Sequence, residues 1–285
     1  MIKDRFYPPT GQLLKWIGNK QKFAAVITDN FPPQFNRYLE PFLGSGAILA
    51  TVAPVNGIGA DTFKPLIEIW QTLKSQPTIV KAWYAERRCL IKNETTKEQI
   101  YKSVQQSYNS KPNGADFLFL SRSCYGGVIR FRKTDGYMST RCGPHTPIPP
   151  ESFNKRVDRW YNRIKHTEFM HADYKETFAM AQKGDLIYCD PPYSFSQSIL
   201  YGAQAFSLAE LFEEIARAKQ KGVFVALSID GHKKSGNFIC DLPIPPNLFE
   251  REVFVDVGVS MLRRFQREGE TLNDENVHDR LLLTY

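Results

Sequence analysis

The chain has 285 residues, of which 42% are hydrophobic and 24% are charged, so extensive disorder is disfavoured. No uncharged apolar run approaches the ~18 residues that a membrane-spanning helix needs, and the N-terminal residues lack the apolar stretch of a signal peptide. We therefore expect a cytoplasmic protein without membrane contact. The net charge is +7, which favours an acidic partner.

Cysteine and histidine residues form no pattern typical of a metal site or a disulfide framework. The five cysteines are widely spaced without a CxxC pair, and the five histidines include no HExxH. An odd number of dispersed cysteines fits a reducing compartment. We expect no metal ion to take part in the chemistry.

The positive charge is concentrated in one segment. Residues 111–165 hold eleven Lys and Arg against four acidic residues, which accounts for the whole net charge of +7. A concentrated positive field suits a polyanion, most often nucleic acid, because neutralised phosphates release counterions. The alternative is a solvated basic face without a partner.

The first part of the chain alternates between strand and helix patterns. We predict a strand at 37–40, a glycine turn at 44–46, a helix at 46–53, a strand at 57–61 and a helix at 65–73. This rhythm is typical of a parallel sheet.

The same rhythm returns after residue 166. The apolar patterns predict strands at 167–173, 185–190, 222–230, 251–259 and 279–285, with helices at 175–182 and 208–221. The last two strands would close the sheet edge. The fold class is therefore α/β, with a doubly wound mixed sheet.

Residues 92–165 differ in composition and pattern from the parts of the chain on either side. They hold polar helical stretches, scattered basic and aromatic residues and the proline-rich GPHTPIPP. We interpret them as an inserted domain, with 1–91 and 166–285 forming one α/β body.

The first candidate site motif is EPFLGSG, from Glu40 to Gly46, at the end of the first strand. Its glycines allow a tight turn that lets a ligand approach the carboxyl end of the strand, where α/β sheets bind ligands. Asp61 ends the next strand, where a carboxylate typically holds ribose hydroxyls. Alternatively, Asp61 caps the helix that starts near Lys64.

The second motif is Asp190-Pro191-Pro192-Tyr193, directly after the apolar strand at 185–190. The prolines remove two N–H donors and stiffen the backbone, so the segment cannot continue as a central strand. An acid, a fixed carbonyl and an aromatic ring are thereby projected together beyond the sheet. This set suits an exocyclic amine on a planar ring. A proline turn with a packed tyrosine is the alternative.

In these motifs the chain resembles the Dam-type DNA adenine-N6 methyltransferases, in the α-class motif order (the D12 class). LLKWIGNK at 13–20 resembles the family's N-terminal LKWxGGK motif, EPFLGSG its cofactor loop and DPPY its catalytic motif. Residues 117–143 resemble the target-recognition block, and RRFQREGETLNDENVHDRLLLTY resembles the closing hairpin. The resemblance implies a Rossmann-like methyltransferase fold with an inserted, mostly helical DNA-recognition domain at 92–165.

The resemblance also implies residue roles. For S-adenosylmethionine, the implied contacts are Trp16, Lys20, Glu40, Phe42, Gly44, Gly46, Asp61, Asp173 and Asp190. The implied catalytic residues are Asp190, Pro191, Pro192 and Tyr193. For duplex DNA, the implied contacts are Lys15, Arg122, Tyr125, Arg130, Arg132 and Arg141, with Tyr125 inserting into the duplex and Arg130 reading guanine. The arginines could instead hold phosphates, which position a protein without specifying sequence.

The implied activity is transfer of a methyl group from S-adenosylmethionine to N6 of an adenine flipped out of duplex DNA. Alternatives are cytosine-N4 methylation, methylation of an RNA or protein amine, and a DNA-binding relative that has lost catalysis. The family also supplies restriction–modification pairs, in which a cognate endonuclease is linked genetically without being bound.

The chain departs from the family pattern at several positions. Gly18-Asn19-Lys20 replaces Gly-Gly-Lys, TFKPLI follows Asp61 where relatives carry DxN, Gly126 stands in place of Asn, and Thr140-Arg141-Cys142 replaces Val-Pro-Phe. The changes in the recognition block leave the adenine chemistry intact but make the family's commonest target, GATC, an open question.

Overall fold

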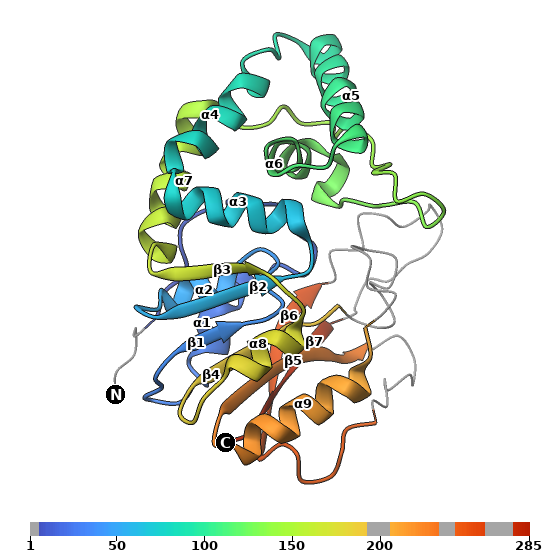
Figure 1. Cartoon of the computed structure of the whole chain (residues 1–285). Helices are drawn as coiled ribbons and strands as arrows, with labels where there is room; N and C mark the ends of the chain where they lie inside the picture. Colours follow the sequence, from blue (N-terminus) through green and yellow to red (C-terminus); the bar gives the residue numbers. More distant parts are fainter. Residues whose placement is uncertain (1–5, 193–205, 234–242, 260–275) are drawn as a thin grey trace.

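The computed structural model describes residues 6–192, 206–233, 243–259 and 276–285 (Figure 1). Its centre is a seven-stranded sheet with the order β3-β2-β1-β4-β5-β7-β6. The strands are β1 (Tyr38–Glu40), β2 (Gly57–Asp61), β3 (Thr167–His171), β4 (Leu186–Cys189), β5 (Phe224–Lys233), β6 (Arg251–Val259) and β7 (Asn276–Leu283). The strand predictions and the mixed α/β class are confirmed.

The first five strands of the sheet are parallel, and β7 runs antiparallel to both of its neighbours. The chain builds β1, β2 and β3 outward in one direction, and then returns to place β4 on the other side of β1. The parallel strands after β1, namely β2 to β5, are each reached by a crossover that carries a helix, as parallel pairing requires.

Helices cover both faces of the sheet (Figure 1). Alternate residues along a strand point to opposite faces, so Leu39 and Ile187 pack with α8 (Tyr174–Met180) and α9 (Leu208–Gln220). Their neighbours Tyr38, Leu186 and Tyr188 belong to the core on the other face. That face is covered by α1 (Ala24–Thr28), α2 (Ala47–Val52) and α3 (Lys64–Ser75).

A group of helices stands beyond the β3 edge of the sheet (Figure 1). It comprises α4 (Pro77–Arg88), α5 (Glu94–Ser110), α6 (Gly114–Ser123) and α7 (Pro150–Ile164). α4 packs against both α6 and α7. One continuous apolar core joins these helices to the sheet.

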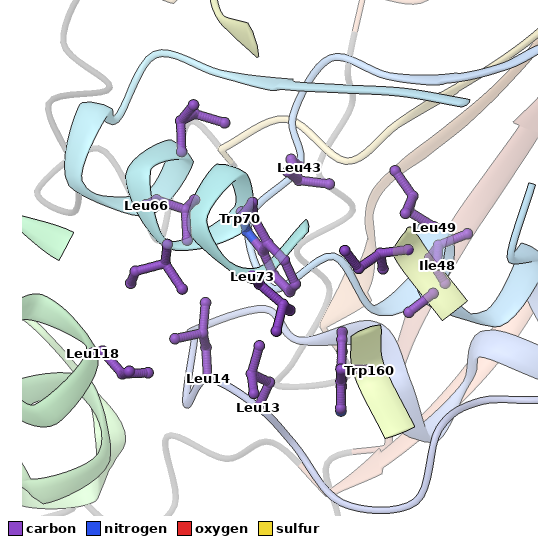
Figure 2. Close-up of a cluster of buried hydrophobic side chains, with 14 of the residues drawn as sticks. Leu13, Leu14, Leu43, Ile48, Leu49, Leu66, Trp70, Leu73, Leu118 and Trp160 are labelled. Atoms are coloured by element: carbon purple, nitrogen blue, oxygen red, sulfur yellow. The ribbon is translucent and has the colours of Figure 1, made fainter. Parts of the chain in front are cut away.

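The N-terminal segment is built into this core. Leu13 and Leu14 are 0% and 1% exposed. Figure 2 shows them beside Leu73 of α3 and near Trp160 of α7, between the sheet-covering helices and the helical part. This burial fixes the backbone that leads directly to Lys15, Trp16 and Lys20.

Candidate active site and nucleic-acid interface

The candidate site lies where the strand order reverses. β1 and β4 are neighbours in the sheet, and the connection from β1 leads to β2 whereas that from β4 leads to β5, so the two connections run in opposite directions. In open α/β sheets, ligands bind outside the carboxyl ends of the strands at such a switch point. Here these ends carry Glu40 and, one residue beyond β4, Asp190.

Lys20 joins the N-terminal segment to Asp190. Its Nζ donates to Asp190 Oδ1 at 2.8 Å and lies 3.5 Å from Asp279 Oδ2 of β7. Lys20 is only 5% exposed, and burial alone would lower the pKa of Lys20. The two carboxylates outweigh burial and raise this pKa above its ordinary value, so the buried ammonium stays charged.

Glu40 is a buried acid behind Asp190. It is 2% exposed, and the Tyr38 hydroxyl donates to its Oε2 at 2.6 Å. Burial raises the pKa of Glu40 well above its ordinary value, the Tyr38 bond opposes this, and the nearby charges of Asp190 and Asp61 raise it further. The carboxyl ends of β1, β2 and β4 therefore bring Glu40, Asp61 and Asp190 together, and the charges of Asp61 and Asp190 act on Glu40.

Asp61 holds the glycine loop. Its Oδ2 accepts the N–H of Gly44 at 3.0 Å, and its Oδ1 accepts the N–H of Phe63 at 3.0 Å. The N-cap residue of α3 is Phe63, without a side-chain cap bond, so Asp61 does not cap the helix as the alternative interpretation expected; it accepts the N–H of the N-cap residue instead. Burial raises the pKa of Asp61, and these two N–H bonds oppose the rise.

The glycine loop needs its glycines. Gly44 and Gly46 have φ values of +46° and +61°, in the left-handed region that favours glycine. A Cβ on Gly44 would stand 2.9 Å from Trp16 Nε1, and one on Gly46 would stand 3.0 Å from Trp70 Cζ2. The backbone of the loop is thus closely covered by Trp16 from the N-terminal segment.

Phe42 and Asp173 lie on the α8 side of the loop. The Phe42 ring stacks on Tyr174, with centroids 5.3 Å apart and planes at 24°. Asp173 is the N-cap of α8: its Oδ1 accepts the N–H of Lys175 at 2.9 Å, and its own N–H donates to Glu176. The helix cap thus already engages the carboxylate for which the resemblance implies a cofactor contact.

The segment expected to recognise DNA folds into a hairpin-like loop, which Figure 1 shows projecting from the helical part on the side opposite α7. Isolated antiparallel bridges pair Cys124 with Cys142 and Phe131 with Met138. Arg130 is exposed and lies on the outgoing limb. Residues 125–141 lie between the two paired cysteines.

Several expected DNA-binding side chains already have neighbours within this loop. The Arg141 guanidinium lies 4.1 Å from the centre of the Tyr125 ring, at the base of the loop. Arg132 forms an ion pair with Asp135 at 2.8 Å near the tip. Exposed Lys15 runs its alkyl stem along the loop, because a Cβ on Gly127 would stand 3.0 Å from Lys15 Cδ.

Helix α5 holds the returning limb of the loop. Asn109 accepts the N–H of Met138 at 2.7 Å and donates to the Met138 carbonyl at 3.2 Å, as a neighbouring strand would. Gln105 and Tyr101 donate to the Thr140 carbonyl at 2.9 and 2.7 Å. The loop is therefore fixed by polar side chains on a helix.

An aromatic cluster connects this loop to the glycine loop. Phe63 lies 4.9 Å from Phe117, 5.8 Å from Phe131 and 6.2 Å from Trp16, measured between ring centroids. Phe63 is part of the TFKPLI departure from the family pattern. Its ring links Phe131 of the hairpin-like loop to the tryptophan that covers Gly44.

Arg122 corrects one expectation. The side chain is 6% exposed, and its Nη1 donates to the carbonyls of Gln12 at 2.9 Å and Leu13 at 2.8 Å. A buried guanidinium engaged in this way does not present itself to a phosphate or a base. Arg122 instead fixes the backbone just before Lys15 and Trp16.

Three arginines of α7 also bond backbone carbonyls, as Arg122 does. They donate to backbone carbonyls: Arg156 to Gln12 at 3.0 Å, Arg159 to Thr10 at 3.5 Å, and Arg163 to Ala50 at 2.8 Å and Thr51 at 2.9 Å. With Arg122, four of the eleven basic residues in 111–165 bond backbone carbonyls. The basic segment is thus not one continuous phosphate-binding face.

A family model described as D12 class N6 adenine-specific DNA methyltransferase matches residues 16–239. The chain belongs to this family. A DNA adenine methylase of Vibrio cholerae is 26% identical over 227 residues, covering 75% of this chain and 79% of the relative. The retron Ec67 DNA adenine methylase of Escherichia coli is 29% identical over 64% of this chain and 63% of its own length.

A third relative is the DNA N-6-adenine-methyltransferase of Escherichia phage P1, 26% identical over 94% of this chain. The match spans 34% of that longer protein. The chain is thus an adenine-specific DNA methyltransferase by family.

Two residues of this D12 class site escaped the sequence analysis. Asp279 shares Lys20 with Asp190, and Tyr38 holds Glu40. Asp279 could have been found as an acid just before the apolar LLLTY strand. Tyr38 could have been found as a hydroxyl two residues before the acid Glu40, on the same face of the strand.

The structure describes only part of the DPPY motif of this methyltransferase. Tyr193 of the DPPY motif lies outside the described residues, whereas Asp190, Pro191 and Pro192 lie within them. Among the residues described, no group of three or more His, Cys, Asp or Glu could hold a metal ion. Within the same ranges, no helix is long and apolar enough to span a membrane.

Proposed function

We propose that the protein transfers a methyl group from S-adenosylmethionine to N6 of an adenine turned out of duplex DNA. The observation that carries this proposal is the position of Asp190-Pro191-Pro192 directly beyond β4, beside Glu40 of β1 at the reversal of strand order. Family membership supports adenine as the base and DNA as the substrate.

The residues at the strand ends fit S-adenosylmethionine. The positive φ values of Gly44 and Gly46 let the backbone turn tightly just beyond β1, where α/β sheets bind ligands, and Trp16 covers one side of this turn. Asp61 and Asp190 offer carboxylate oxygens for hydroxyl and ammonium groups, and Phe42 offers an aromatic surface. When bound, the cofactor supplies an electrophilic methyl group on a sulfonium.

Asp190 and Pro191 would activate the target amine. The N6 lone pair of adenine is conjugated with its ring and is a poor nucleophile. If Asp190 and the Pro191 carbonyl each accept one N–H bond, the lone pair localises as the nitrogen becomes tetrahedral. Holding the amine in this orientation lowers the entropic part of the barrier.

The hairpin-like loop would bind the duplex from which the adenine is turned out. Chemistry on a base requires that the base leave the stack, at a cost of a few kcal/mol. Tyr125 provides a ring that can fill the space left behind, and exposed Arg130 provides a guanidinium that can bond guanine O6 and N7. Arg141 lies against this ring and Lys15 lies beside Gly127 of the same loop, and both add positive charge.

The test is methyl transfer from labelled S-adenosylmethionine to duplex DNA, followed by nucleoside analysis. We expect N6-methyladenine, and Asp190→Asn should lower turnover by at least about 100-fold because a transition-state acceptor is lost. DNA affinity should change far less. Asp158→Asn, which alters an exposed ion pair with Lys81 on α4, is the matched control.

Two results would contradict the proposal. One is methylcytosine in place of N6-methyladenine. The other is an Asp190→Asn enzyme that keeps the turnover of Asp158→Asn, which would move the catalytic centre away from the end of β4.

A further inference from the structure

Cys124 and Cys142 face each other at the base of the hairpin-like loop. The N–H of Tyr125 donates to the Arg141 carbonyl at 2.9 Å, and the N–H of Gly143 donates to the Ser123 carbonyl at 2.8 Å. These bonds flank the two cysteines, so the bridge that pairs them is a non-hydrogen-bonded antiparallel pair.

This pairing brings two side chains into reach of a disulfide. In a non-hydrogen-bonded pair, the Cα atoms are about 4.5 Å apart and the side chains are at their closest. Disulfides form at Cα separations of about 4.4–6.8 Å. The base is also rigidly packed, because a Cβ on Gly143 would stand 2.9 Å from the carbonyl oxygens of Ser123 and Cys124.

We propose that Cys124 and Cys142 form a reversible disulfide site that closes residues 125–141 into a covalent loop. Both cysteines are thiols in this structure, with Cys124 buried and Cys142 half-buried. The loop enclosed carries Tyr125, Arg130 and Arg141. The existence of the site does not rest on the proposed function, since it depends on thiol geometry alone.

The oxidant is a low-molecular-weight disulfide such as oxidised glutathione. The thiolate of half-buried Cys142 attacks one sulfur of this disulfide, releases one small thiolate and forms a mixed disulfide. The thiolate of Cys124 then attacks the Cys142 sulfur and releases the second small thiolate. The two protein thiols lose two protons and two electrons, and the small disulfide is reduced to two thiols.

The thiols react as thiolates, so the exchange should accelerate with pH. Burial raises the pKa of Cys124 to about 12 and also raises that of Cys142. The charge of Lys15 lowers the pKa of Cys124, and Cys142 raises it. The charge of Lys97 lowers the pKa of Cys142, and Glu98 and Glu94 raise it. The experiment is therefore run near pH 8.5, where a larger share of each thiol is ionised.

The test treats the whole protein with oxidised glutathione and then maps tryptic peptides without reduction. We expect a mass loss of about 2 Da for the pair and a cross-link between SCYGGVIR (123–130) and CGPHTPIPPESFNK (142–155), reversed by dithiothreitol. Exposed Cys89 should acquire only a glutathione adduct in the wild type, so the matched control Cys89→Ser should lose that adduct and keep the cross-link.

A thermal measurement separates a native cross-link from a distorting one. Closing a 17-residue loop (residues 125–141) in an undistorted structure should raise Tm by about 5 °C, and Cys142→Ser should abolish the rise. A stable glutathione adduct on Cys142 without the cross-linked peptide would overturn the proposal. A cross-link that lowers Tm would show that the disulfide distorts the folded structure, which would contradict the proposal that the two cysteines are positioned for it.

Discussion

At the scale of single residues, the site depends on a buried cation shared between two strands. Lys20 contacts both Asp190 and Asp279, whose side chains are 19% and 14% exposed. Removing one partner of a buried pair costs more than the pair itself contributes, because a charge is left without compensation.

We therefore expect Lys20→Met to lower the free energy of unfolding by about 3–5 kcal/mol. The double variant Lys20→Met, Asp279→Asn should recover part of this loss, since fewer negative charges then repel one another. Urea unfolding near neutral pH measures both, with exposed Lys22→Met as control. Equal stability of Lys20→Met and Lys22→Met would show that the ion pair contributes nothing.

Glu40 gives a pH-dependent prediction with the opposite sign from a salt-bridged acid. Its pKa is raised in the folded protein, so the stability it contributes is full below the unfolded pKa and is lost as pH rises through the folded value. Gln imitates the protonated form. Glu40→Gln should match the wild type at acidic pH and exceed it near pH 8, by about 1.4 kcal/mol for each unit of elevation.

Urea unfolding at about pH 3.5, below the unfolded pKa, and at about pH 8 measures this difference. Glu213→Gln, on the exposed face of α9, controls for the loss of a carboxylate. A Glu40→Gln protein that is less stable at both pH values by the same amount would mean that Tyr38 and the buried carboxyl act only through packing.

At the scale of elements, the sequence patterns predicted where strands and helices lie along the chain. They did not predict which distant segments contact one another. Each strand of the central sheet is an apolar run bounded by turn residues, so its position along the chain followed from this local pattern. The placement of β7 between β5 and β6 depends on pairing of distant segments, which such patterns do not encode. The same holds for Arg122, whose carbonyl partners lie 109 and 110 residues away.

The hairpin-like loop depends on α5 in the same non-local way, and this can be tested. Asn109 satisfies both backbone groups of Met138. Asn109→Ala should lower the free energy of unfolding by about 1–3 kcal/mol, because the N–H of Met138 loses its acceptor, whereas the Met138 carbonyl keeps the Gln105 amide at 3.0 Å. It should also reduce discrimination between duplexes, since the limb that returns from Arg130 is no longer fixed.

The measurement pairs urea unfolding with binding to a panel of duplexes that each carry one altered base pair. Gln106→Ala, an exposed neighbour on α5, is the matched control. If Asn109→Ala weakens binding to every duplex equally while stability falls, the loop does not discriminate sequence and Arg130 acts on phosphate.

At the scale of the whole molecule, the basic residues of segment 111–165 include one group that bonds backbone carbonyls and another that is exposed on the hairpin-like loop. Arg122, Arg156, Arg159 and Arg163 hold backbone carbonyls and tie the N-terminal segment and α2 to the helical part. Lys133 and Arg141 are exposed on the hairpin-like loop. Seven of the eleven basic residues in 111–165 therefore lie outside this carbonyl-bonding group.

Salt dependence distinguishes these two groups. Each phosphate neutralised adds about 0.9 to the slope of log K against log salt concentration. Arg141→Gln should reduce the slope by about that amount and leave Tm nearly unchanged, because the side chain is exposed. Arg156→Gln should leave the slope unchanged and lower Tm, because it removes the bond to the Gln12 carbonyl, which Arg122 shares. Titrating one duplex at several salt concentrations, beside a thermal melt of each variant, tests both. Should Arg156→Gln flatten the slope while Tm holds, α7 would face the DNA, and the division between structural and phosphate-binding arginines would have to be redrawn.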